Sequence, residues 1–199
     1  MKQTIAEVVK NLQGVSANWL IGGSCGLLLQ GVQIGKEPRD LDMYADSDDA
    51  AAIAMQLSPW SVDSPQYSET EIYRSVLSHY RFNQMTVELV GGFQIISKGS
   101  IYTVETAYLR RSHAVMIEVG EVLVPLMPLA HELIFNLLRG REDRYGAIAA
   151  VMRADPDNHW PTLNSLLRRN TLSKELLRRM EDLLAVDAPA TRGINRHES

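Results

Sequence analysis

Two aspartates that lie two residues apart, Asp40 and Asp42, are the first candidates for chemistry in this chain. If the segment 39–44 is a strand, the alternation of its side chains sends both carboxylates to one face and Leu41 and Met43 to the other. Two neighbouring carboxylates repel each other unless a cation joins them, and oxygen ligands favour Mg²⁺ or Mn²⁺. The pair therefore predicts a divalent-metal site, with a solvated strand face as its alternative.

A glycine-rich turn upstream of the aspartates is a candidate anion site. Gly22 and Gly23 have no Cβ, so an anion can approach their amides closely, and Ser24 can cap a following helix and offer its hydroxyl. Amides at a helix start favour phosphate. Arg39, directly before the acidic pair, could also contact a phosphate. The alternatives are a plain turn into a helix for the glycines and an ion pair with an exposed acid for Arg39.

Glu88 is the third acidic candidate. It interrupts the apolar run 87–90, and an ionised glutamate in such a run needs a partner or an ion. On a strand, Val87 and Leu89 point into the core while Glu88 faces the other side. A solvated edge of the sheet is the alternative.

The elements that must position these residues follow from hydrophobic periodicity and from turn residues. We expect a strand at Trp19–Ile21, a helix from Ser24 to about Gly31, and a loop over 32–38 that brings the Asp40 strand beside the first one. Flanking helices are predicted at 4–13 and at 50–55, the second capped by Asp46. Further strands are predicted at 72–76, 79–82 and 85–90, with a turn at 83–84 and an end at Gly91–Gly92, and within 113–124.

The period changes to helical after Pro128, with helices predicted at 129–138, 147–152, 160–169 and 173–184. We therefore expect an α+β fold, in which a small mixed sheet carries helices on one face and a C-terminal helical bundle walls a cleft. The predicted division is a sheet domain at 1–127, a helical domain at 128–186 and a flexible tail at 187–199.

Composition narrows the class of protein. The 199 residues are 45% hydrophobic, which is usual for a globular chain, and the net charge of −4 gives no basic footprint for nucleic acid. Nucleic acid is thus a less favoured partner than a small acceptor. Cys25 is the single cysteine, no apolar stretch reaches the length of a membrane span, and the histidines share no zinc-type spacing. We expect a cytoplasmic protein without a membrane partner.

The Gly-Gly-Ser turn followed by Asp-Leu-Asp resembles the signature of the DNA polymerase β-type nucleotidyltransferase superfamily. The resemblance implies transfer of a nucleoside monophosphate from an NTP to a hydroxyl, with release of pyrophosphate and two Mg²⁺ ions. It implies that Asp40 and Asp42 hold the ions and that the turn binds the β- and γ-phosphates. Glu88 matches the third acid of the family, where Asp is commoner, and its role as metal ligand or base stays open.

The segment from Pro125 onward is similar to antibiotic- and toxin-type nucleotidyltransferases, in which lysines of the first helices face the nucleotide. No lysine lies between Leu129 and Asp143 here, and Glu142 replaces one. Arg139 and Arg141 are the candidate substitutes, with a solvated helix end as the alternative. We expect a small antibiotic-like acceptor and ATP or another NTP. The alternatives are a toxin-type enzyme acting on RNA or protein and an inactive relative that binds nucleotide.

Overall fold

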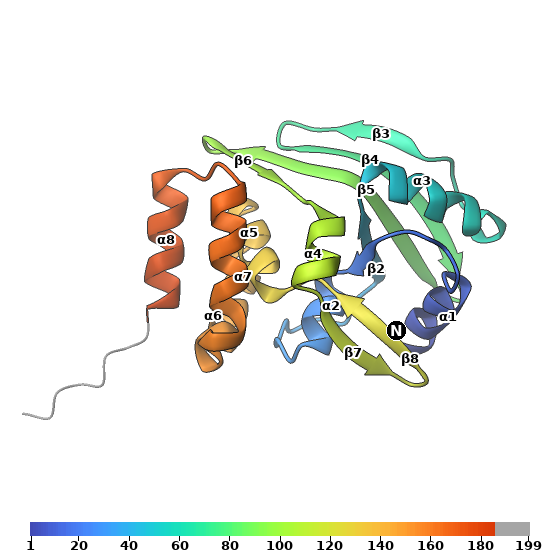
Figure 1. Ribbon diagram of the computed structural model, residues 1–199, viewed down its shortest axis with the longest axis horizontal. Helices are drawn as coiled ribbons and strands as arrows, with labels where there is room; N and C mark the ends of the chain where they lie inside the picture. Colours follow the sequence, from blue (N-terminus) through green and yellow to red (C-terminus); the bar gives the residue numbers. More distant parts are fainter. Residues whose placement is uncertain (186–199) are drawn as a thin grey trace, which may run out of the picture.

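A computed structural model describes residues 1–185 of the chain (Figure 1). Its helices are α1 (Lys2–Asn11), α2 (Gly23–Leu29), α3 (Ser47–Gln56), the 3-10 helix η1 (Ser58–Trp60), α4 (Thr106–Ser112), α5 (Leu129–Leu138), α6 (Glu142–Ala154), α7 (Pro156–Arg169) and α8 (Lys174–Leu184). Its strands are β1 (Trp19–Ile21), β2 (Asp40–Ala45), β3 (Gln66–Glu69), β4 (Tyr73–Phe82), β5 (Met85–Ser97), β6 (Ser100–Thr103), β7 (Val115–Val119) and β8 (Val122–Leu126).

The strands form one mixed sheet in the order β3-β4-β5-β2-β1-β8-β7, and β6 pairs with β5. The β2–β5 and β1–β8 pairs are parallel and the other pairs are antiparallel. The loop over 32–38 returns the chain so that β2 lies beside β1, as the sequence predicts, and the structure shows that the two strands are antiparallel. The α+β prediction, with a mixed sheet followed by C-terminal helices, is confirmed.

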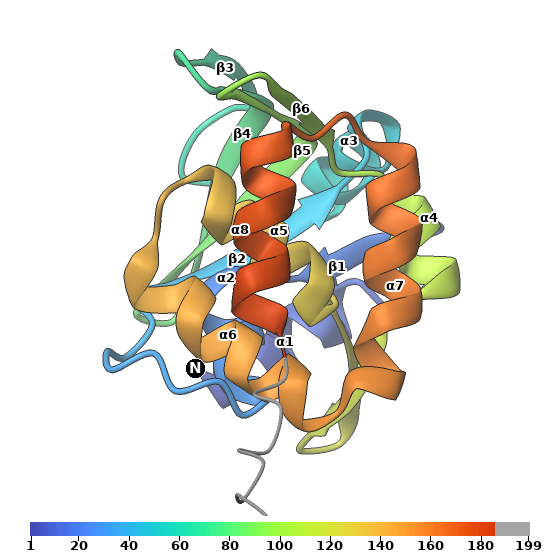
Figure 2. The same cartoon turned by 90° about the vertical axis from the view of Figure 1, so that its left-hand side faces the viewer.

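Helices cover both faces of the sheet, so the prediction of helices on one face is wrong. One apolar cluster joins α1 and α3 to Leu41, Met43 and Val87. A second cluster joins α5 to α8 with Leu20 and Tyr44 of β1 and β2. Figure 1 shows α5 to α8 on the left of the sheet, and Figure 2 shows α7 and α8 standing side by side in front of it. The alternating side chains of the central strands supply both clusters.

The predicted end of β5 at Gly91–Gly92 is also wrong, since the strand continues to Ser97. A Cβ at Gly91 would lie 2.8 Å from Cβ of Ala50, so the glycine allows α3 to pack directly on the strand. Gly92 has a φ of +59°, which the glycine tolerates without strain. The pair marks close packing rather than a strand end.

Asp46 occupies the N-cap position of α3, as predicted, but its side chain serves another helix. Its two carboxylate oxygens accept hydrogen bonds from the amides of Thr106 and Ala107 at 2.8 and 3.0 Å. These amides open α4, an element that periodicity does not reveal. The side chain therefore ties α4 to the end of β2.

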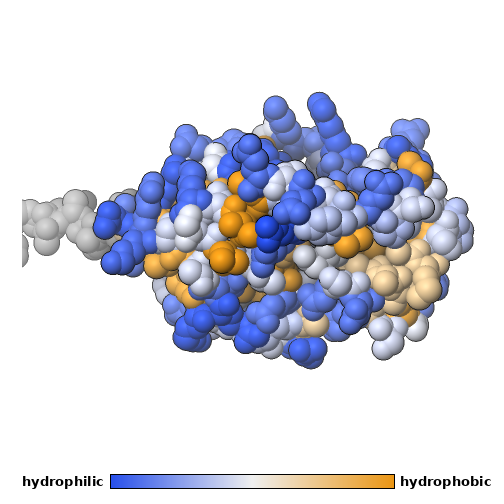
Figure 3. Space-filling model, turned by 90° about the horizontal axis from the view of Figure 1, so that it is seen from above, coloured by the Kyte–Doolittle hydropathy of each residue, from blue (hydrophilic) through white to orange (hydrophobic). Residues whose placement is uncertain are grey.

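The break predicted between residues 127 and 128 falls between β8 and α5, but the second apolar cluster crosses it, and the division into two domains stays a prediction. The predicted tail, 187–199, lies outside the described residues. Within residues 1–185, no helix has both the length and the apolar character of a membrane span. Seen from above, hydrophilic side chains cover most of the molecule and apolar ones form separate patches (Figure 3).

Candidate active site

Three predicted carboxylates share one face of the central strands. Asp42 and Glu88 are register partners on the parallel pair β2–β5, and Asp40 lies two residues before Asp42. Leu41 and Met43 between and after the aspartates are fully buried on the opposite face. The alternation expected from the sequence thus places Asp40, Asp42 and Glu88 on the same side of adjacent strands.

The glycine turn packs directly on the Asp42 carboxylate. The amide of Gly22 donates to the Asp42 carbonyl at 3.1 Å, and Gly23 adopts a φ of +58°. A Cβ at Gly23 would overlap Oδ2 of Asp42, so the approach requires glycine for both space and conformation. Cys25, buried beside the turn, donates its thiol to the Asp40 carbonyl at 3.3 Å. The glycine turn and the two aspartates therefore pack together as one assembly.

The electrostatics of this assembly favour a bound cation. Burial, followed by the neighbouring charges of Asp40, Glu88 and Glu132, raises the pKa of Asp42 to about 7, against a smaller opposing effect of Arg139. The oxygen donors suit Mg²⁺. Among residues 1–185, however, no three Asp, Glu, His or Cys side chains are gathered closely enough to form a complete metal site. The carboxylate oxygens of Asp40 and Asp42 are nevertheless of the donor type that suits such a cation.

A cavity of about 340 Å³ opens over the carboxylates, between the sheet and α5. Its wall combines the three acids with aromatic rings, including Tyr73 and Phe135. The guanidinium of Arg139 lies over these two rings, 5.8 and 4.7 Å from their centroids. Arg139, one of the two predicted substitutes for the family lysine, thus lines the acidic cavity.

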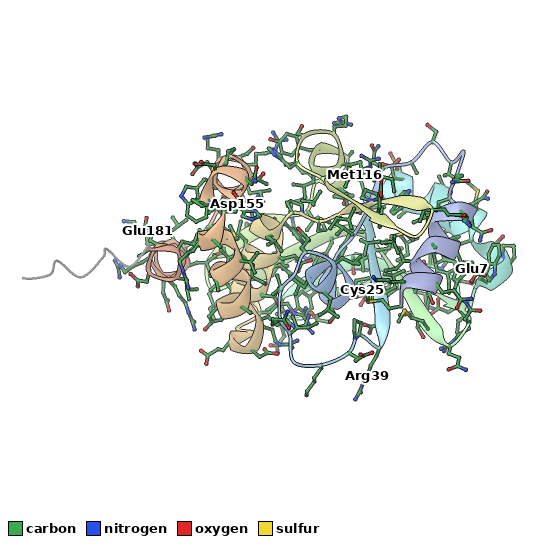
Figure 4. All side chains as sticks on the ribbon, turned by 90° about the horizontal axis from the view of Figure 1, so that it is seen from below. Glu7, Cys25, Arg39, Met116, Asp155 and Glu181 are labelled. Carbon is green, nitrogen blue, oxygen red and sulfur yellow. The ribbon has the colours of Figure 1, made fainter. Side chains whose placement is uncertain are left out.

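A second cavity, of about 510 Å³, meets the first at Asp40 and is basic. Three basic side chains outnumber two acidic ones in its wall, which consists of Ser24, Lys36, Glu37, Pro38, Arg39, Asp40 and Arg144. Figure 4 shows Arg39 on the loop at the lower edge of the molecule, pointing outward. Arg144, on α6, donates to Oγ of Ser24 at 2.8 Å. This positive groove adjoins the aspartates on the side of the glycine turn.

The cation nearest the turn is therefore Arg144, which the sequence analysis did not single out. The other predicted substitute, Arg141, pairs with Asp143 at 2.7 and 2.8 Å and lies outside both cavities. Arg144 is one of four charged residues between 141 and 144, and no periodicity separates it from its neighbours. Only the hydrogen bond from Arg144 on α6 to Ser24 in α2 identifies it.

Glu132 is a second residue that the sequence analysis missed. It is 1% exposed, and its carboxylate accepts hydrogen bonds from the Gly23 amide at 2.8 Å and from Asn136 at 3.3 Å. Burial raises its pKa, and these hydrogen bonds and two arginines oppose the rise. The Gly23 amide predicted to bind phosphate is engaged by Glu132 in this structure. A charged residue inside the apolar helix 129–138 was the available signal.

The sequence also matches the model of a known protein family. The sequence model described as aminoglycoside-2''-adenylyltransferase matches residues 4–135, from α1 into α5. The chain belongs to this family. It is a nucleotidyltransferase with the fold of that class of enzyme. No curated protein sequence matches the chain significantly.

One solved structure with a TM-score above 0.5 supports the fold. A nucleotidyltransferase from Thermotoga maritima is 21% identical, with a TM-score of 0.60 over 80% of this chain and 91% of that one. The antibiotic-resistance factor ANT(2'')-Ia is 7% identical, with a TM-score of 0.49 over 91% and 96%. The lincosamide adenylyltransferase LnuA with bound lincomycin is 8% identical, with a TM-score of 0.48 over 76% and 98%. The family member described here shares the fold of the first, and the sequence match carries the family assignment.

Proposed function

We propose that the protein transfers AMP from ATP to a hydroxyl of an aminoglycoside-like acceptor and releases pyrophosphate. The observation that carries this proposal is the register of β2 and β5, which places Asp42 beside Glu88 in the acidic cavity, and this cavity meets the basic one at Asp40. Membership of the aminoglycoside-2''-adenylyltransferase family supports the reaction class. In such a reaction the basic cavity would bind the triphosphate of ATP and the acidic cavity would bind the acceptor.

Asp40 and Asp42 would hold Mg²⁺, with Glu88 completing the ligand set or taking the proton of the acceptor hydroxyl. Bound there, two ions would neutralise the charge that develops on the α-phosphate and on the leaving pyrophosphate. The raised pKa of Asp42 supports this role, because a carboxylate that is buried and also surrounded by other carboxylates gains most from a cation.

The basic cavity would hold the triphosphate. Ser24 offers a hydroxyl, and Arg144 and Arg39 offer guanidinium groups that suit phosphate oxygens. The amide of Gly23 already donates to Glu132. The phosphates would therefore bind mainly to these side chains, whereas the sequence analysis expected them to bind mainly to the amides of the turn. Gly22 and Gly23 keep their proposed role as the turn that lets the phosphates approach.

The acidic cavity would hold the acceptor. Asp40, Asp42 and Glu88 give it negative charge, which attracts an ammonium-bearing sugar. Tyr73 and Phe135 offer apolar walls against which a sugar ring can pack. An aminoglycoside combines both features, and the acceptor hydroxyl would then lie near Glu88.

The proposal is tested by pyrophosphate release from ATP and Mg²⁺ with a panel of acceptors. The panel contains tobramycin and kanamycin as polycationic sugars, lincomycin as a less cationic acceptor, and a short RNA. We expect release with an aminoglycoside, dependence on Mg²⁺, and a mass increase of the acceptor that corresponds to one AMP. Asp42→Asn should abolish it.

Release with RNA alone would instead support the toxin-type alternative. ATP binding without release with any acceptor would support the inactive relative. Equal rates of wild type and Asp42→Asn would contradict the assignment of the acidic pair, whichever acceptor is used.

A further inference from the structure

We propose that Asp63 and His79 are positioning residues that restrain the Glu88 carboxylate at the edge of the acidic cavity. The inference rests on the proposed function, in which Glu88 acts beside the acidic pair. It adds two residues from the loop after η1 and from β4, neither of which carries a sequence motif.

A row of paired residues crosses three strands of the sheet. His79 of β4 is the register partner of Glu88 of β5, and Glu88 is the register partner of Asp42 of β2. Alternation places the three side chains on the face that carries the acidic cavity. Nε2 of His79 lies 3.5 Å from Oε2 of Glu88. The imidazole thus flanks Glu88 on the side away from Asp42.

Asp63 fixes the imidazole through two contacts. One carboxylate oxygen lies 2.6 Å from Nδ1 of His79, and the other accepts the backbone amide of the same residue at 2.8 Å. An ionised carboxylate can only accept, so Nδ1 is the donor to Asp63, and Nε2, which faces Glu88, donates to that carboxylate when the ring carries both protons. The amide of Val62 also donates to the His79 carbonyl at 2.8 Å. The loop at 62–63 is therefore anchored to this histidine by main-chain and side-chain bonds.

Glu88 needs such support because its long side chain is otherwise free. Its side chain is 33% exposed, and within residues 1–185 its one ion-pair contact is the 3.5 Å approach of His79 Nε2. A glutamate has three side-chain torsions, and a reacting group that leaves its productive geometry loses much of its rate advantage. The contact with the imidazole therefore restrains the carboxylate on the β4 side of the acidic cavity, which Glu88 lines together with Asp42.

The first test compares kinetics of four variants with ATP and the acceptor found in the panel assay. His79→Ala should lower kcat about 10-fold and leave KM for ATP within about twofold, because the histidine touches Glu88 and not the phosphate cavity. His79→Gln keeps an N–H of similar reach and should recover most of the rate. Asp63→Asn should show a smaller fall, since the amide can still bond the imidazole.

Arg81→Ala is the matched control. Arg81 lies two residues after His79 on the same strand face and is exposed. Its removal changes the surface charge beside Glu88 without touching the Asp63–His79 pair. We expect kcat and KM of the wild type.

The second test needs no activity. A double-mutant cycle of His79→Ala and Glu88→Gln, followed by urea denaturation, measures whether the two side chains interact. We expect the stability change of the double variant to differ from the sum of the single changes. Additive changes would overturn the contact on which the proposal depends.

The two tests separate the proposals. A wild type that transfers AMP while His79→Ala keeps the wild-type kcat would overturn the positioning role and leave the proposed function intact. The positioning role would also be overturned if His79→Ala and His79→Gln both lowered kcat and both lowered the free energy of unfolding by the same amount. A wild type without transfer activity would overturn the proposed function, and the cycle would then decide on the contact by itself.

Discussion

Ionisation of Asp42 should make the metal-free protein less stable as the pH rises. Burial and the neighbouring acids raise the pKa of Asp42 from 3.8 to about 7 in the folded chain. The folded state therefore holds this proton more tightly than the unfolded state does. The contribution of Asp42 to stability is fully present below the unfolded pKa of 3.8 and is lost as the pH rises through about 7.

The magnitude follows from the two pKa values. Integrating the difference in bound protons between about pH 5 and pH 8 gives a loss of about 2.5 kcal/mol in the free energy of unfolding. Solvent that enters the cavity reduces this figure, so it is an upper bound. Asp42→Asn cannot ionise and should lack this part of the pH dependence. The variant should therefore approach or exceed the stability of the wild type at pH 8.

Urea denaturation at several pH values, in EDTA, measures this difference. Glu181→Gln, an exposed carboxylate on α8, is the control and should run parallel to the wild type. Millimolar Mg²⁺ at pH 8 should stabilise the wild type and leave Asp42→Asn unchanged. Parallel curves for the wild type and Asp42→Asn would refute the reasoning, because they would mean that the neighbouring carboxylates do not disturb Asp42.

Three further changes test the rest of the site. Gly23→Ala should lower the free energy of unfolding by at least about 2 kcal/mol more than Gly120→Ala in urea, since both glycines have positive φ but only the first has a neighbour in the way. Arg144→Ala should raise KM for ATP about 10-fold or more with a smaller effect on kcat, whereas Arg141→Ala should change neither. Glu88→Gln should leave ATP binding, measured by calorimetry, within a few-fold and cut turnover about 100-fold, and full turnover would move the third acidic role elsewhere.

Local patterns predict the strands and helices that carry strong alternation or helical period. The Asp-Leu-Asp segment illustrates this, because its pattern fixes which side chains face the core before any partner strand is known. The β4–β5 hairpin is similar, with Asn83 in the predicted turn at a φ of +54°. These predictions need information from only a few neighbouring residues.

The features that the sequence analysis did not predict depend on contacts between distant parts of the chain. Gly91 resembles a strand end until the side chain of Ala50 is seen against it. Arg144 and Glu132 meet the glycine turn across more than a hundred residues of sequence. His79 becomes relevant only through its register with Glu88. No local pattern carries this information, since it arises when the helices and the sheet pack together.

The apolar cluster shared by the sheet and the C-terminal helices has a consequence for how the chain can be divided. The family similarity ends at residue 135, inside α5, yet Leu20 and Tyr44 pack in one cluster with Ile148, Leu166 and other residues of α6 to α8. A fragment cut where the similarity ends would expose that apolar surface beneath the strands that carry the glycine turn and Asp42. The segment that identifies the family is therefore shorter than the segment that has to fold for its site to form.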